Sequence, residues 1–148
     1  GWIPLYYSPE RPDIFDLSDF AIPQNFEIAV NVTVNICENI EEGLLPQKAI
    51  IAFYIGGMGA QERNFHTELM GRMGYEEEAK NIQDLFLNGK RNEAIMAVPS
   101  AFADEISLVG PKERIAERLG LWRDSPVTTL IVGANNTNTL RTMAELAL

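Results

Sequence analysis

The chain has 148 residues, of which 46% are hydrophobic, and a formal net charge of −9 at pH 7. This length and composition are enough for one ordinary domain, and the acidic excess argues against binding to nucleic acid or to an anionic membrane. The single Cys37 excludes an internal disulfide and fits a reducing, cytoplasmic environment. No apolar run approaches the ~18 residues of a membrane span, and no secretory signal opens the chain.

The first 25 residues predict a short strand followed by a loop. Trp2–Tyr7 is rich in aromatic and β-branched residues and ends at Ser8-Pro9. The segment from there to Asn25 holds three prolines and three aspartates, so we expect a loop with at most a short helix. Because the chain opens without Met and is strand-like from its second residue, we expect a sequence that begins within a domain.

Phe26–Ile36 shows the clearest strand pattern of the chain. Its even-numbered positions are apolar, and its odd-numbered positions, which include Asn31, Thr33 and Asn35, are mostly polar. Two interpretations follow. The strand either has one solvated face, which alternation alone favours, or belongs to a barrel, with its apolar face under helices and its polar face in a wet, ligand-holding interior.

The remainder predicts helices and one more strand. The strand is Val127–Val132, apolar or β-branched on both faces, as is typical of a buried parallel strand. A helix is expected from Glu38 through Tyr54, with Pro46 as a kink or restart. A second is expected over Asn64–Met73, with Phe65, Leu69 and Met73 inward and Gly74 as a left-handed end. Further helices are expected over Glu76–Leu87, over Arg91–Val98, after Pro111, and from a cap at Thr137 or Asn138. This order predicts an α/β fold with parallel connections. Three strands are few for so many helices, which fits a fragment.

A glycine-rich turn, AFYIGGMGAQERNF, lies between two of the predicted helices. Gly57-Met58-Gly59 supplies the start of a dinucleotide-binding G-x-G-x-x-G pattern, but Glu62 occupies the third glycine position. The preceding run also continues a helical segment and does not stand alone as a strand. The pattern is therefore a weak indication of a nucleotide site.

Other candidate residues carry little chemistry on their own. His66 is the only histidine and has no nearby cysteine, so no metal site is predicted, and a structural position at the edge of a buried helix face is favoured. Arg63 follows the glycines and could grip a phosphate or carboxylate, although a surface role is the simpler interpretation. The charges of residues 112–118, including Arg114 and Arg118, are typical of a solvated helix face.

Several phrases, taken together, carry a resemblance to a known family. They are GWIPLYYSPE, AFYIGGMGAQERNFH, RMGYEEEAKNIQDLFLNGKRNEAIMAVP, SLVGPKERIAERL and VTTLIVGA, and they span essentially the whole chain in order. The sequence resembles the C-terminal part of the luciferase-like monooxygenase superfamily, in particular its oxidoreductases that use the deazaflavin coenzyme F-420.

The resemblance implies a partial (β/α)8 TIM barrel made of the last three parallel strands. Residues 1–148 would form the C-terminal portion of a single luciferase-like domain. Trp2–Tyr7 would be strand six, Phe26–Ile36 strand seven and Val127–Val132 strand eight, with a helical insertion between the second and third of these. The polar face of Phe26–Ile36 would then point into the barrel.

The resemblance also implies where a ligand would bind, because barrels of this kind carry their chemistry at the carboxyl ends of the strands. The expected cofactor- or substrate-binding residues there are Tyr6, Tyr7, Thr33 and Asn35, with Gly133 and Ala134 beside them. The insertion is expected to fold over the same mouth. It would supply Tyr54, Gly56, Gly57, Met58 and Arg63 as lid or pocket residues. No catalytic acid, base or nucleophile is placed, and no metal is expected.

The implied function is that of an oxidoreductase. The full-length parent would move a hydride between coenzyme F-420 and a small organic substrate, or would use reduced FMN with oxygen as the alternative cofactor. The chain by itself is expected to be an inactive fragment. The competing hypothesis is a non-catalytic association module that pairs through exposed sheet edges with another chain or with itself as a homo-oligomer.

Overall fold

The computed structural model describes residues 1–58 and 63–147, and the chain falls into two compact units. The first unit comprises Gly1–Gly43 and Asp104–Leu148, and the second comprises Leu44–Ala103. Gly59 and Glu62 of the glycine-rich turn lie outside the described residues. Each unit buries its own set of apolar side chains.

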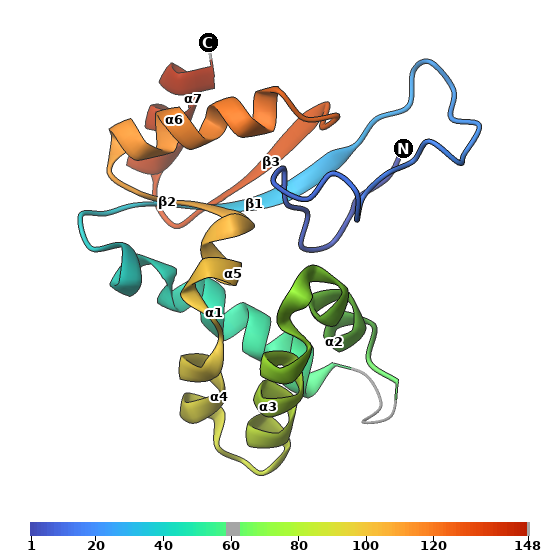
Figure 1. Cartoon of the computed structure of the whole chain (residues 1–148). Coiled ribbons are helices and arrows are strands. Elements are labelled where there is room, and N and C mark those ends of the chain that lie inside the picture. Colours follow the sequence, from blue (N-terminus) through green and yellow to red (C-terminus); the bar gives the residue numbers. More distant parts are fainter. Residues whose placement is uncertain (59–62, 148) are drawn as a thin grey trace. The chain divides into compact units, whose positions relative to one another are not determined.

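The first unit is built on a sheet of three parallel strands with helices against one face (Figure 1). The strands are β1 (Ala29–Ile36), β2 (Ser107–Gly110) and β3 (Thr129–Ala134), and the helices are α6 (Lys112–Arg123) and α7 (Thr137–Ala147). The order across the sheet is β2-β1-β3, so the second and third strands pair with opposite edges of the first. The predicted α/β class with parallel strands is confirmed.

One edge of β1 is shared between two segments that lie far apart in the sequence. Near its start, Trp2 donates its amide to Glu27 O at 2.8 Å and accepts from the Ala29 amide at 2.9 Å. Farther along the same edge, β2 pairs with Thr33–Ile36 of β1. The Ile28 carbonyl points to the other edge, where it accepts from the Thr128 amide at 3.0 Å. β1 is therefore the central strand of the sheet.

The prediction of a short strand over Trp2–Tyr7 is wrong. Only Trp2 pairs, as an isolated bridge to Ile28. Pro4 has no amide to donate, and Tyr6 has a φ of 49°, in the left-handed region where an extended strand cannot continue. The strand that replaces it, β2, was missed because all four of its residues are buried and show no alternation.

The other two predicted strands are present with shifted ends. β1 begins three residues later than expected: the Phe26 amide bonds the Pro23 carbonyl in a turn, and Ile28 pairs with Trp2 as an isolated bridge. β3 covers Thr129–Ala134 instead of Val127–Val132 and is an edge strand, so the expectation of burial on both faces is wrong. Ile131 on its open face is 42% exposed.

The core of the first unit lies between the apolar face of the sheet and the two helices. Val30, Val32 and Val34 of β1 are each at most 2% exposed. They belong to one cluster with the apolar side of α6, namely Ile115, Leu119 and Trp122, and with Met143 of α7. The predicted apolar stripes of β1 and α6 are thus confirmed. Burying one such side chain contributes roughly 1.5–3 kcal/mol.

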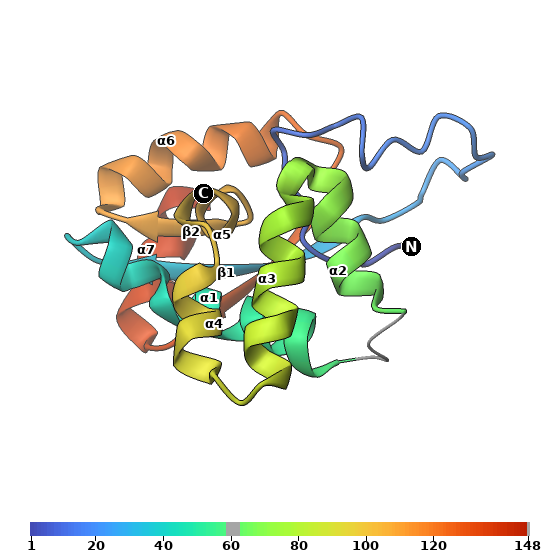
Figure 2. The same cartoon turned by 60° about the horizontal axis from the view of Figure 1, so that its bottom comes forward.

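The second unit is helical. It holds most of α1 (Ile40–Gly57), then α2 (Phe65–Met70), the π-helix η1 (Gly71–Tyr75), α3 (Glu76–Leu87), α4 (Arg91–Ala97) and the first part of α5 (Ser100–Glu105). Figure 2 shows α3 and α4 side by side. Gly74 has the predicted left-handed conformation, with a φ of 92°, at the junction of η1 with α3.

Four helix details differ from the predictions. α1 runs through Pro46 as one helix, so no restart occurs there. Phe65, expected inward, is 58% exposed. The side chain that caps α7 is that of Asn136, whose Oδ1 accepts from the Thr139 amide at 2.8 Å, and not that of Thr137 or Asn138. α5 was not predicted at all, because six residues are too few to show a helical period.

Candidate functional site

The polar face of β1 forms a row of small side chains across the sheet. Thr33 is in register with Ser107 of β2 on one side and with Gly133 of β3 on the other. Ser107 is fully buried, Thr33 is half-buried and Gly133 is exposed. The row therefore becomes more open toward β3, and it lies on the face opposite the apolar core.

The open end of this row is created by Gly133. A Cβ atom placed on Gly133 would meet only the Val32 carbonyl oxygen at 3.5 Å and the Thr33 Cα at 3.9 Å, which are ordinary van der Waals contacts. The position that a side chain at Gly133 would take is therefore open. A planar group could lie there against the backbone.

Asn35, one strand position farther along the same face, is used to hold the backbone. Its Nδ2 donates to the Gly43 carbonyl at 2.9 Å, which ties the end of β1 to the first turn of α1. Gly43 itself has no room for a side chain, because a Cβ would lie 2.3 Å from the Cys37 Sγ and 2.8 Å from a Val109 methyl group. Asn35 therefore lies at the predicted edge of the sheet, but its side chain is used to join β1 to α1.

The end of β2 is fastened by an arginine that the sequence analysis placed on a solvated face. Arg114 pairs with Asp104 through two hydrogen bonds, of 3.0 and 2.7 Å, and also donates to the Val109 carbonyl. The hydrogen bond with Asp104 is the main cause that raises the pKa of Arg114. Arg118 is 16% exposed and donates to the Asp104 carbonyl at 3.0 Å. The two arginines are thus partly buried and hydrogen-bonded to other segments, so the prediction of a wholly solvated helix face is wrong.

The two predicted tyrosines are both buried. Tyr7 is 3% exposed and belongs to the core cluster, with its ring centroid 4.9 Å from that of Phe15 and 5.8 Å from that of Trp122. Tyr6 is 8% exposed at the position of left-handed backbone. The structure therefore brings Thr33 together with Asn35 and Gly133 but places Tyr7 under the helices.

In the second unit, the predicted glycines lie at a contact between two helices. A Cβ on Gly56 would lie 2.2 Å from the Cβ of Phe86 in α3, and one on Gly57 would lie 3.1 Å from an edge atom of the same ring. These glycines therefore let α1 and α3 approach closely. Met58 is 42% exposed and Arg63 is also exposed, one on each side of residues 59–62.

The junction of α1 and α2 is held by Asn64, which the sequence analysis did not select. Asn64 is 5% exposed, and its Oδ1 accepts from the amides of His66 and Thr67 at 2.9 and 3.4 Å. Its Nδ2 donates to the Ile55 carbonyl at 2.6 Å. The signal was available, because Asn is a preferred residue just before a helix.

His66 and Tyr54 meet at the same junction. Their ring centroids are 4.9 Å apart, and burial lowers the pKa of His66 below its ordinary value. Because α1 is a helix up to the glycines, the strand that a dinucleotide-binding turn requires is missing there. The nucleotide-loop interpretation is therefore wrong.

Two features are absent from the described part of the chain. Within residues 1–58 and 63–147, no three His, Cys, Asp or Glu side chains gather closely enough to hold a metal ion. Over the same residues, no helix is both long and apolar enough to span a bilayer.

Comparison with known proteins decides the family. Residues 19–129 match the family described as luciferase-like monooxygenase. The chain belongs to this family. It is 30% identical over 155 residues to a Mycobacterium tuberculosis protein named as a coenzyme F-420-dependent oxidoreductase. That alignment covers 99% of this chain and 45% of the relative, so the chain spans about half the relative's length.

A solved structure supports the same fold. The chain superposes on the coenzyme F-420-dependent tetrahydromethanopterin reductase of Methanopyrus kandleri with a TM-score of 0.57 and 18% identity. The superposition covers 82% of this chain and 33% of the reductase. At this identity the likeness concerns the fold alone, and it agrees with the predicted partial barrel.

Proposed function

We propose that this luciferase-like chain forms the C-terminal part of an oxidoreductase that uses coenzyme F-420. The whole protein would transfer a hydride between this deazaflavin and a small organic substrate. The observation that carries the proposal is the family match over residues 19–129, together with the name of the 30% identical relative. The sheet supports it, because its parallel strands bring a polar row to one face near their carboxyl ends.

The residues of that row fit a flat, hydrogen-bonding ring. Gly133 leaves open space next to the backbone of β1, and the half-buried Thr33 contributes a hydroxyl that can both donate and accept. Bound there, the deazaflavin would supply the hydride chemistry. The chain's own part is to bind and orient it. Thr33 and Gly133 would make direct contact, and Asn35 would act as a positioning residue through its bond to Gly43 in the first turn of α1.

Residues of the second unit enter the proposal unequally. Met58 and Arg63 are exposed and remain candidates for contact with coenzyme or substrate. Gly56 and Gly57 are explained by the Phe86 contact, and Tyr54 by its packing against His66, so we assign these three a supporting role. We assign Tyr7 to the core for the same reason.

An anaerobic titration of the full-length parent with F-420 and with FMN tests the proposal. We expect F-420 to bind and Gly133→Leu to weaken that binding at least tenfold, since the leucine side chain would occupy the space beside Thr33. Gly120→Leu is the matched control, because a Cβ at Gly120 in α6 meets nothing within 4 Å. Tight binding of FMN without binding of F-420 would mean that FMN is the cofactor. Binding of neither would refute the proposal.

A second candidate function rests on the edge strand. Among the described residues, β3 pairs only with β1, and Ile131 on its open face is 42% exposed. Such an edge can pair with another chain. If the 148-residue chain acts as an association module, its elution volume in size exclusion will fall with rising concentration, and Ile131→Lys will reverse the change. A monomer at all concentrations would exclude this function.

A further inference from the structure

The turn between α3 and α4 contains an Asn-Gly pair. Asn88 is followed by Gly89, and no other asparagine of the sequence precedes a glycine. Both residues are exposed, and a Cβ on Gly89 would meet nothing within 4 Å. Because glycine has no side chain, its amide nitrogen is unhindered and its backbone turns freely. This pair is therefore the place in the chain where the backbone can most easily attack an asparagine side chain.

The two groups that would react are held by the end of α3. Asn88 Nδ2 donates to the Asp84 carbonyl at 2.8 Å, and the Gly89 amide donates to the Phe86 carbonyl at 3.0 Å. The Lys90 amide bonds the carbonyl one residue before that of Phe86, at 2.9 Å, and Gly89 has a φ of 77°. These bonds form a Schellman motif, which ends a helix at a left-handed glycine. The reaction must therefore wait until the turn opens.

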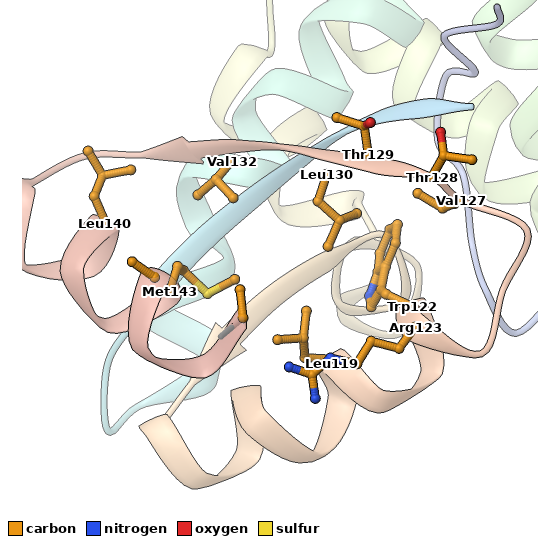
Figure 3. Close-up of a pocket in the computed structure, with 12 residues that line it drawn as sticks. Leu119, Trp122, Arg123, Val127, Thr128, Thr129, Leu130, Val132, Leu140 and Met143 are labelled. Atoms are coloured by element: carbon orange, nitrogen blue, oxygen red, sulfur yellow. The ribbon is translucent and has the colours of Figure 1, made fainter. Parts of the chain in front are cut away.

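Little apolar burial keeps this end of α3 closed. Ile82 is its last buried side chain, Phe86 is half-buried, and Leu87, next to Asn88, is 51% exposed. The end of α6 is different, because Trp122 in its last turn is 2% exposed and its ring extends toward β3 (Figure 3). Segments with few buried apolar contacts open locally at a lower free-energy cost than those with many. The end of α3 should thus open far more often than that of α6.

We propose that Asn88 is a site of spontaneous deamidation and that the reaction releases the turn between α3 and α4. In the open turn, hydroxide removes the Gly89 amide proton, and this nitrogen attacks Asn88 Cγ. The new N–Cγ bond forms as the Cγ–Nδ2 bond breaks, and the departing nitrogen takes a proton from water and leaves as ammonia. Water then opens the five-membered succinimide at either of its carbonyls, which gives aspartate or isoaspartate.

Neither product can restore the original turn. Aspartate has a carboxylate in place of the amide donor, so it cannot bond the Asp84 carbonyl. Its charge also lies at the negative end of the α3 dipole. Isoaspartate carries the main chain through its side chain, and the added methylene breaks the spacing of the Schellman bonds. Asn88 is outside the set of proposed coenzyme contacts, so this inference and the proposed function can fail separately.

The site is tested by incubating the 148-residue chain at pH 8 and 37 °C, with peptide mapping by mass spectrometry at intervals. We expect the mass gain of an amide converted to an acid at Asn88, with both isoaspartate and aspartate formed, and none at Asn92, which is exposed but precedes Glu93. The rate should rise with hydroxide concentration, and Asn88→Gln should abolish the gain. An intact Asn88, or aspartate without isoaspartate, overturns the proposal.

Control by the turn is tested by repeating the incubation in guanidinium chloride. Asn88 should react at least tenfold faster there, because the bonds of its side chain and of the Gly89 amide no longer hold the two groups. The ratio of the two rates measures how seldom the turn opens in the folded chain. Equal rates would show that the Schellman motif does not control the reaction, and would overturn that part of the proposal.

Release of the turn is tested with Asn88→Asp, a stable copy of one product. Amide exchange at residues 89 and 90 should be about fivefold faster than in the unmodified chain, the effect of losing one hydrogen bond. Asn92→Asp is the matched control and should leave exchange unchanged, because it places its carboxylate in the first turn of α4, where the helix dipole favours it. Unchanged exchange in Asn88→Asp would overturn the claim that deamidation releases the turn.

Discussion

Two glycines, Gly133 in the first unit and Gly56 in the second, lie in opposite surroundings. A Cβ on Gly133 would make only ordinary contacts, the nearest at 3.5 Å, whereas one on Gly56 would lie 2.2 Å from Phe86 Cβ. The first glycine leaves space open beside a polar side chain. The second lets two helices meet. A glycine near a predicted site therefore indicates a ligand only where the space it leaves is not filled by the protein itself.

Gly56→Ala should have the largest effect on stability. The methyl group would overlap Phe86, and overpacking of this kind costs about 2 kcal/mol even after the gain in helix propensity. Gly133→Ala should change the free energy of unfolding by less than about 0.5 kcal/mol. Urea unfolding followed by circular dichroism measures both.

The double variant Gly56→Ala/Phe86→Gly separates this contact from other causes. The nearest atom to the added methyl group is Phe86 Cβ, so removing the whole side chain should make the methyl group harmless, and the two substitutions should not be additive. If Gly56→Ala costs the same with and without the Phe86 side chain, the close approach of α1 and α3 at Phe86 is not the reason for the glycine.

Asn64→Ala comes next, with an expected loss of about 1.5 kcal/mol, because it removes a helix cap and a buried hydrogen bond together. Asn64→Asp sharpens the result. The aspartate keeps the oxygen that accepts from His66 and Thr67 but loses the donor to Ile55. Amide exchange should therefore accelerate at residues 66 and 67 in the alanine variant only. Equal exchange in both variants would contradict the capping role.

Asn35→Ala tests the corresponding tie in the first unit and should cost about 1 kcal/mol, the value of one hydrogen bond. Asn31→Ala, at an exposed position on the same face of β1, is the matched control and should cost less than about 0.5 kcal/mol. Thermal unfolding compares them. Two equal values would mean that the bond to the Gly43 carbonyl contributes nothing measurable.

The sequence predicted elements with a regular period far better than those without one. The alternation of β1 and the stripe of Ile115, Leu119 and Trp122 in α6 identified the faces that form the core. β2 could not be found in this way, because four fully buried residues have no period. Its place at the edge of β1 is fixed by pairing between segments some seventy residues apart, which no local pattern records.

The candidate site was predictable where strand periodicity fixes the direction of a side chain, as at Thr33. It was not predictable where a contact between distant residues decides. Tyr7 joins the core because it packs against Phe15 and Trp122. The need for glycine at position 56 is explained only by Phe86, which α3 places against it. Asn64 was visible as a helix cap, but its second bond to Ile55 requires the fold.

The smallest expected effect is a pH dependence that belongs to the second unit. Burial lowers the pKa of His66 below its ordinary value of 6.5, so the unfolded chain binds this proton more readily than the folded one. The stability due to neutral His66 is present in full above pH 6.5 and is lost as the pH falls from there through the lower pKa of the folded state. Its ring protons, the only histidine signals of the chain, report that pKa directly by NMR.

His66→Gln supplies the control for this pH dependence, because it keeps a polar side chain but cannot titrate. The difference in unfolding free energy between the two proteins should shrink or change sign as the pH drops from 7 to 5, in favour of the variant. Carboxylates that titrate in the lower part of this range are common to both proteins and cancel. A ring that titrates at or above pH 6.5 in the folded chain would show that the packing against Tyr54 does not exclude water from His66.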